Sequence, residues 1–210
     1  MPSRYSDELA EISEQAVQRL GLRNQAREQA LPASREVIRF SANAIRAVHR
    51  GEFDEASKLL ERAAQRLKDT EPIRQEAPEI YFAGFMTDAR KEFTEAHVTL
   101  AVLSGQSLPK PQDLGVEPST YLNGMAEVIG EVRRYILDSL RRDSFEGCQE
   151  FMDVMDEIYS ILVMVDFPEA VTGGLRHSTD QMRGVLERTR GDLTMALRQH
   201  KLEAQLAQWE

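Results

Sequence analysis

The amino-acid sequence predicts an all-α protein, on three observations. Apolar residues recur at helical spacing along nearly all of the 210 residues, and no convincing run of alternating β-branched residues predicts a strand. Proline and glycine gather at a few places that divide the chain into long segments. With 41% hydrophobic and 29% charged residues, the chain can bury a core. We therefore expect a seven-helix bundle that forms a single domain over residues 1–210.

The N-terminal half is expected to hold four of these helices. The first covers about Tyr5 to Gln29 and ends before Pro32, because proline inside a helix removes a hydrogen bond and clashes with the preceding turn. The second begins near Ala33 and ends at Gly51, and the third runs from about Phe53 to Lys68. A fourth, long helix extends from about Glu79 to Ser104, after two prolines.

The C-terminal half is expected to hold the other three helices. The clearest loop precedes them, GQSLPKPQDLGVEP at residues 105–118, with three prolines and two glycines. The helices follow at about Tyr121–Arg142, Phe145–Val165 and Leu175–Gln208. Pro168 and the Gly173-Gly174 pair separate the last two.

Composition excludes several classes of protein. Cys148 is the single cysteine, so neither an internal disulfide nor a cysteine-based zinc site is possible within one chain. The opening residues MPSRYSDELAEISEQ are polar and acidic, unlike a signal peptide, and the longest apolar run, Ser160–Phe167, is too short for a membrane span. We therefore expect a cytoplasmic protein with no membrane partner.

The formal charge of −9 argues against an exterior that binds nucleic acid everywhere. Only five of the 26 basic residues are lysines, however, and arginine is the residue suited to bidentate phosphate contacts. Genome composition alone can produce the same bias. Any nucleic-acid surface is therefore expected to be local or made by assembly.

Four glutamates in two short segments are the most informative feature of the chain. Glu92 and Glu95 lie three residues apart, and Glu127 and Glu131 lie four apart, so each pair shares one face of its helix. Apolar neighbours on both segments are expected to point into the core. If the two faces meet, four carboxylates converge, and their repulsion needs a compensating positive charge. A divalent metal is the obvious candidate, and glutamates on a solvated helix face are the alternative.

A cluster of this kind is an all-oxygen ligand set. It suits Mg²⁺, Mn²⁺ or Ca²⁺ and not zinc or copper, and the Glu-x-x-His pairs of di-iron bundles are absent. Acidic Mg²⁺ clusters serve phosphodiester hydrolysis, where the metal positions a water and stabilises the leaving oxygen. Asp88, one turn before Glu92, can hold a metal-bound water. Flanking phosphates can be held by Arg90, Lys91, Arg133 and Arg134.

At these residues the chain resembles the translin and translin-associated factor X (TRAX) proteins. The segment YLNGMAEVIGEVRR looks like the signature segment of that family, and YFAGFMTDARKEFTEAHVTL is similar to its preceding long helix. SREVIRFSANAIRAVHRGEFDEASKLL resembles the early helices of the family. The resemblance spans about Ser34 to Gln205 and is strongest from Tyr81 to Leu137. The short length and acidic composition resemble a prokaryotic, archaeal version.

The resemblance implies a seven-helix protein that assembles into hollow homo-oligomers, octamers in this family, and binds single-stranded RNA and DNA. It also implies, from the TRAX branch, a Mg²⁺-dependent endoribonuclease acting inside the closed shell. The glutamates Glu92, Glu95 and Glu131 match acidic positions of TRAX. Glu127 replaces an aspartate of TRAX, and this longer side chain can shift the metal. The translin branch implies the alternative, a single-strand DNA- and RNA-binding protein without chemistry.

In a closed shell, arginines can line the inner wall while the exterior stays acidic. The candidates lie at offsets of 4, 7 and 4 along one helix face, and they are Arg35, Arg39, Arg46 and Arg50. A solvated arginine ridge is the alternative. Aromatic stacking partners for single strands could come from Tyr81, Phe82 and Phe85. A third hypothesis is a helical scaffold that acts through protein partners.

Overall fold

A computed structural model describes residues 3–207, and helices are the regular structure of that part of the chain. Six helices have 16 residues or more, and four are single turns of four residues. In order, they are α1 (Ser6–His49), α2 (Phe53–Lys68), α3 (Ile73–Glu76), α4 (Pro78–Tyr81), α5 (Gly84–Ser104), α6 (Pro111–Leu114), α7 (Pro118–Leu140), α8 (Cys148–Val163), α9 (Glu169–Thr172) and α10 (Leu175–Leu206). The prediction of an all-α fold is confirmed.

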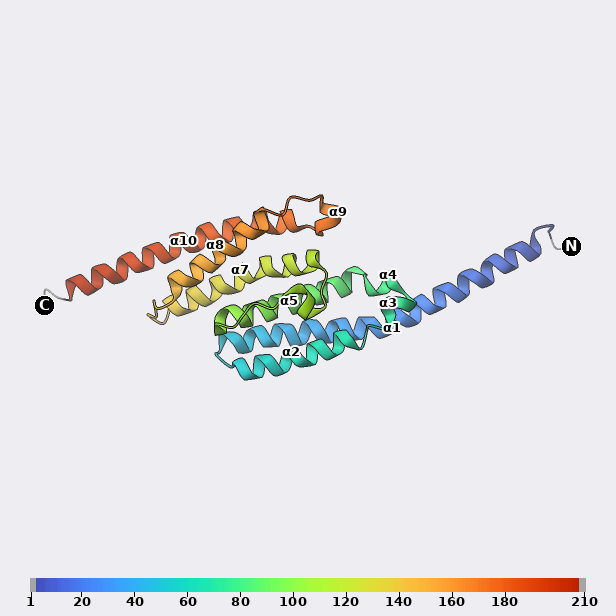
Figure 1. Cartoon of the computed structure of the whole chain (residues 1–210), viewed down its shortest axis with the longest axis horizontal. Coiled ribbons are helices and arrows are strands. Elements are labelled where there is room, and N and C mark those ends of the chain that lie inside the picture. Colours follow the sequence, from blue (N-terminus) through green and yellow to red (C-terminus); the bar gives the residue numbers. More distant parts are fainter. Residues whose placement is uncertain (1–2, 208–210) are drawn as a thin grey trace.

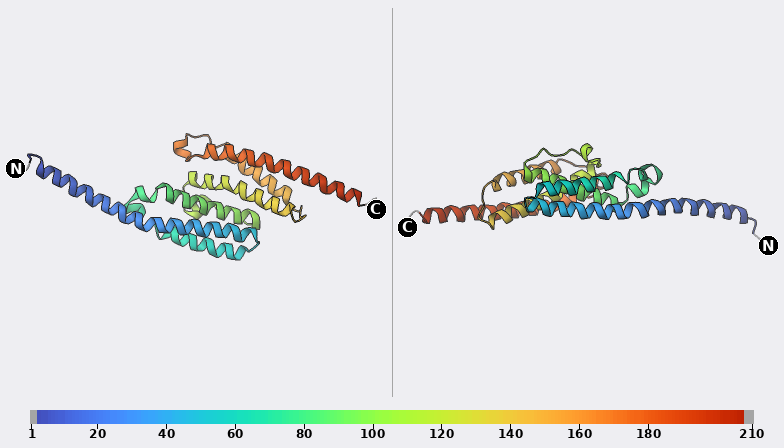
Figure 2. Two further views of the ribbon diagram at one scale, coloured as in Figure 1. Left: turned by 180° about the vertical axis from the view of Figure 1, so that it is seen from behind. Right: turned by 90° about the horizontal axis from the view of Figure 1, so that it is seen from below.

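The long helices lie side by side in a row (Figure 1). Helix α1 packs on α2 and α5, α5 packs on α7, and α7 packs on α8 and α10. The view from below in Figure 2 shows that the row is thin, with α1 and α10 extending beyond the packed body at opposite ends. Within residues 3–207, every helix is too short or too polar to span a lipid bilayer.

Helix α1 corrects the expected boundary at Pro32, because it runs through the proline for 44 residues. The proline is exposed, so its ring lies on the solvent side of the helix, where a lost hydrogen bond can be replaced by water. Buried residues lie on both sides of it, Ala30 before and Val37 after. Packing of these residues against the body holds the helix continuous, although the local sequence predicts a break.

The expected helix from Glu79 to Ser104 is interrupted, which is a second correction. Ala83 is extended, with φ −63° and ψ 151°, so α4 ends and α5 begins across it. The break frees the carbonyl of Tyr81, which accepts a hydrogen bond from Arg90 Nη1 at 2.9 Å. The other boundaries lie within three residues of the expectation. The expected end of the last helix, Gln208, lies outside the described residues.

The main core lies between α1, α5, α7, α8 and α10, and fully buried side chains such as Val37, Val98, Ile129 and Met155 fill it. A smaller apolar cluster, around Ala30, Tyr81 and Met86, joins α1 to α3, α4 and the start of α5. Burial of these side chains stabilises each by roughly 1.5–3 kcal/mol relative to exposure. The central pair of helices, α5 and α7, is thereby fixed from both sides.

Candidate metal centre

Gly124 brings α5 and α7 unusually close together. A Cβ at this position would lie 2.7 Å from the backbone oxygen of Lys91 and 2.9 Å from Thr94 Cβ, distances that no real side chain tolerates. Only glycine therefore allows the two backbones to approach in this way. The contact lies one turn from Glu127 on α7 and between Lys91 and Glu95 on α5, so it sets the separation of the carboxylates.

Three of the four predicted glutamates converge across this helix pair. One carboxylate oxygen each from Glu92, Glu95 and Glu127 lies within 4.8 Å of the other two. Glu95 is the most buried of them, with 8% of its surface exposed, while Glu92 and Glu127 are half-buried. The prediction that the two helix faces meet agrees with this geometry.

The fourth glutamate, Glu131, lies one turn further along α7 and is held by groups outside this cluster. Its Oε2 atom is 2.5 Å from His49 Nε2, and Arg134 Nη1 lies 3.7 Å from the same oxygen. The His49 side chain is 95% buried, in the last turn of α1. The helix end expected at Gly51 puts His49 in the last turn, but its partner is 82 residues away and could not be predicted from spacing.

Lys91 supplies a positive charge beside the carboxylates. Its Nζ donates to Glu127 Oε1 at 2.6 Å. Partial burial lowers the pKa of Lys91, but the hydrogen bond and the charges of Glu127, Glu92 and Asp88 outweigh it and raise the pKa overall. The ammonium therefore offsets part of the repulsion in the cluster. The sequence suggested Lys91 as a phosphate contact, whereas here it binds a carboxylate.

Burial and mutual repulsion hold protons on the cluster. Burial, and then the negative charges of Glu127, Glu92 and Glu131, raise the pKa of Glu95 to about 8. Burial also raises the pKa of Glu92, with Glu127 adding to the effect. Burial and negative neighbours penalise the ionised form of Glu95, and a bound cation would offset that penalty in place of the proton.

The donor set fits a hard divalent ion. Oxygens bound to one octahedral Mg²⁺ lie about 2.9 Å apart when adjacent and about 4.1 Å apart when opposite, so the three oxygens, within 4.8 Å of one another, would draw closer by side-chain rotation to enclose an ion. Glu92, Glu95 and Glu127 would hold it, and Asp88, exposed one turn before Glu92, is placed to hold a bound water. All of these ligands are oxygens, which favours Mg²⁺ or Mn²⁺.

The raised pKa of Glu95 predicts an unusual pH dependence of stability. Between pH 4.5 and about 8, the folded protein keeps a proton that the unfolded chain has released, so stability falls as pH rises. Burial lowers the pKa of His97 to about 4, which gives the opposite slope below pH 6.5. Above pH 6.5, therefore, the metal-free protein should lose about 2 kcal/mol of unfolding free energy by pH 8.

This expectation can be checked by urea unfolding in EDTA at a series of pH values. The same series with Mg²⁺ should show stability that no longer falls, because metal binding requires the deprotonated carboxylates. A metal-free protein whose stability is level or rises between pH 6.5 and 8 would contradict the description of Glu95 as a buried, protonated acid.

The other basic residues predicted from the sequence lie in different surroundings. Arg133 is directed toward α10, where it donates to Thr189 Oγ1 at 2.9 Å and pairs with Asp192 at 2.8 Å. Arg134 is exposed at the edge of the cluster, beside Glu131. The four candidates in the second half of α1 and at its C-terminal end are all exposed and remain candidates for nucleic-acid contact, and they are Arg35, Arg39, Arg46 and Arg50.

Arg90 is buried, with 6% of its surface exposed, so its guanidinium is not presented to solvent. It lies over the ring of Tyr81, 4.0 Å from the ring centroid. Tyr81 is buried too, and its hydroxyl donates to Glu71 at 2.5 Å. Of the three aromatic candidates for base stacking, Phe82 is the exposed one, at 48%.

A helical row with carboxylates converging on its two central helices defines the class: an all-α protein with a candidate oxygen-ligand metal centre. Solved structures with this fold are similar to the chain. A C3PO structure, AfC3PO in complex with duplex RNA, is 35% identical with a TM-score of 0.81, covering 87% of this chain and 95% of that one. The crystal structure of AfC3PO alone is 34% identical, with a TM-score of 0.80 and the same coverage.

The chain belongs to the translin family. The C3PO structures are of the translin/TRAX type and belong to the same family. A further C3PO, apo-NeC3PO, has the same fold at 17% identity and a TM-score of 0.75, over 93% of this chain and 99% of that one. An uncharacterized protein of Methanocaldococcus jannaschii is 29% identical over 189 residues, which are 89% of this chain and 83% of the relative. No protein-family model matches the chain.

Proposed function

We propose that this protein is a divalent-metal-dependent endoribonuclease that cleaves single-stranded RNA inside an oligomeric shell. The observation that supports this most strongly is the convergence of Glu92, Glu95 and Glu127 across α5 and α7. Family membership supports RNA as the substrate, because a relative that is 35% identical has been solved with duplex RNA. Because that relative was solved with a duplex, the test compares single-stranded with double-stranded RNA.

The residues of the cluster take distinct roles in this proposal. A bound Mg²⁺ or Mn²⁺ would acidify a water and stabilise charge on the scissile phosphate. Glu92, Glu95 and Glu127 hold the ion. Glu131 has its Oε2 fixed by His49, so its Oε1 can accept the proton of the attacking water. Lys91 moves its ammonium from Glu127 to a non-bridging phosphate oxygen as the substrate binds.

A homo-oligomeric shell, as large as an octamer, is part of the proposal because the ends of α1 and α10 find no cover within one chain. Residues 3–25 are all exposed, and apolar side chains lie among them. Those on one face at helical spacing are Tyr5, Leu9, Ile12 and Leu20, with 47–63% of their surface exposed. Contact with other copies would bury this apolar stripe. Light scattering of the purified chain gives the mass that tests this.

In such a shell, the candidates to face the substrate are Arg134 and the four arginines Arg35, Arg39, Arg46 and Arg50. Arg39 and Arg50 are paired with neighbouring glutamates, Glu36 at 3.2 Å and Glu52 at 2.6 Å. Exposed pairs of this kind contribute little stability, so a phosphate can displace the glutamate at small cost. Single-stranded DNA would be bound through the same contacts, because phosphates carry no distinction between the two nucleic acids.

The test is cleavage of a short unstructured RNA by the full chain with Mg²⁺, with Mn²⁺ and with EDTA. The same RNA annealed to its complement is a second substrate. We expect internal cleavage of the single strand that needs the metal, and slower cleavage of the duplex. Intact RNA in every condition would rule out the nuclease.

The alternative is a translin-like binding protein without chemistry, and one observation favours it. The ammonium of Lys91 already neutralises part of the cluster through Glu127, so the glutamates can be stable without a metal. Binding of single strands with equal affinity in Mg²⁺ and in EDTA, without products, would establish this alternative.

A further inference from the structure

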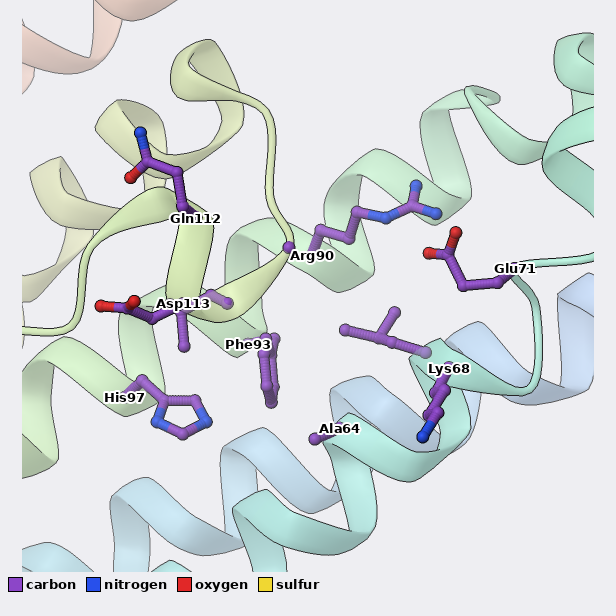
Figure 3. Close-up of a pocket in the computed structure, with 11 residues that line it drawn as sticks. Ala64, Lys68, Glu71, Arg90, Phe93, His97, Gln112 and Asp113 are labelled. Atoms are coloured by element: carbon purple, nitrogen blue, oxygen red, sulfur yellow. The ribbon is translucent and has the colours of Figure 1, made fainter.

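A cavity of about 370 Å³ lies against α5 (Figure 3). At 100° per residue, the α5 residues that line it fall on the opposite side of the helix from Glu92 and Glu95. Arg90, Phe93 and His97 line it from α5, at the i, i+3 and i+7 positions of one helix face. Ala64 and Lys68 line it from α2, and the α6 turn closes the remaining side. Its volume is within the range of small-molecule sites, roughly 300–1,000 Å³.

Two side chains that line the cavity have buried polar atoms without a partner. Arg90 Nη2 makes no hydrogen bond, although the residue is 94% buried, and His97 Nε2 has none either. Buried polar groups in proteins are nearly always paired, so such atoms point to a missing partner. A ligand held in the cavity can supply it after a small adjustment of the two side chains.

Two cationic groups with unused donors, those of Arg90 and Lys68, lie at one end of the cavity. The ammonium of Lys68 has no hydrogen bond or ion pair among residues 3–207. Figure 3 shows Lys68 and Arg90 at the same end of the cavity with Glu71 between them, so a ligand that contacts both cations would draw the flexible lysine side chain toward it. Each of the two acids nearby has one carboxylate oxygen bonded. Glu71 accepts from the Tyr81 hydroxyl, and Asp113 accepts from the backbone N–H of Lys110. A ligand that brings acceptor oxygens to the Arg90 end therefore matches the cavity.

The middle and the far end of the cavity suit a ring. Phe93 lies between Arg90 and His97 and, with Leu67 and Leu114, makes the centre apolar. His97 is seven residues from Arg90, which is about 10 Å along a helix. We propose that the cavity binds a small organic anion, with its acidic group at Arg90 and Lys68 and a ring whose polar edge reaches His97. Nucleotides and aromatic acids both have this chemistry.

Calorimetric titration of the full chain in EDTA tests the proposal with two ring-bearing anions, adenosine 5′-monophosphate and indole-3-acetate. The isolated parts, adenosine and inorganic phosphate, are titrated beside them. We expect at least one of the anions to bind with a Kd of roughly 1 mM or tighter, and both parts to bind at least about tenfold more weakly. The anion that binds more tightly identifies the source of the ligand. EDTA removes binding that depends on a metal at the carboxylates.

Two variants locate the binding. Ala64→Phe fills the cavity and should abolish binding, whereas Gln65→Phe, on the neighbouring exposed position, should leave it unchanged. Lys68→Ala should weaken it by about tenfold or more, the effect of one charge-assisted hydrogen bond, and Lys58→Ala should not. Failure of both anions to bind, equal binding by the parts, or full binding in Ala64→Phe would each overturn the proposal.

Discussion

The Glu95→Gln variant should lose metal-dependent RNA cleavage, with a fall of roughly a thousandfold or more. Glu95 is the most buried carboxylate of the cluster, and an amide in its place removes a negative ligand without changing the shape of the side chain. A loss of about 4 kcal/mol in stabilisation of the transition state corresponds to that fall in rate. Two measurements on the variant and the parent check this: the rate of RNA cleavage at saturating Mg²⁺, and the affinity for Mn²⁺ from electron paramagnetic resonance.

The same variant should become more stable than the parent in EDTA at pH 8 and above. Glutamine resembles the protonated acid, so the variant is spared the cost of ionising Glu95. Loss of activity with a gain of stability separates a functional carboxylate from a structural one. Glu61→Gln on the exposed face of α2 is the matched control, which should keep full activity and the parent's pH profile. Equal activity of Glu95→Gln and Glu61→Gln would remove the cluster from the mechanism.

The Gly124→Ala variant should separate α5 from α7 and weaken the metal centre. Its methyl group would meet the backbone oxygen of Lys91 at 2.7 Å, and backbone cannot move aside as a flexible side chain can. We expect a loss of about 1–3 kcal/mol in unfolding free energy, the usual cost of overpacking. Affinity for Mn²⁺ should fall by roughly 10–100-fold, as it does when the support of a metal ligand is disturbed.

Gly130→Ala is the matched control, because it lies in the same helix and a Cβ there meets nothing within 4 Å. Alanine in a helix interior is favoured over glycine by about 0.5–1 kcal/mol, so this variant should be as stable as the parent or slightly more so. Urea unfolding and the Mn²⁺ titration of both variants decide the matter. A stable Gly124→Ala variant with unchanged Mn²⁺ affinity would show that the close approach of α5 and α7 does not determine the geometry of the metal site.

The parts of the fold that local chemistry determines were predictable from the sequence. Helix α2 has the predicted bounds, Phe53–Lys68, because a strong apolar stripe and a preceding glycine act within the same segment. The boundary at Pro32 was wrong, since packing of residues distant in sequence outweighs the local cost of proline in α1. The break at Ala83 was missed because no proline or turn dipeptide marks it.

The candidate site was predictable to a similar extent. Spacing within each helix indicated which glutamates share a face, and three of them meet across α5 and α7. The contact of Glu131 with His49 joins helices 82 residues apart, so no spacing rule could reveal it. The buried orientation of Arg90 depends on the break after Tyr81, which the sequence did not predict. Roles of charged residues are therefore the least predictable part, because they depend on tertiary neighbours.

The unbroken course of α1 through Pro32 has a mechanical consequence. A helix of 44 residues is about 66 Å long, and its first turns belong to the same rigid rod as the last turn, which carries His49. Residues 26–48 of this helix are anchored in the core, so the exposed first turns project from the body in a fixed direction. A partner that holds those turns is thereby placed at a fixed angle to the packed body.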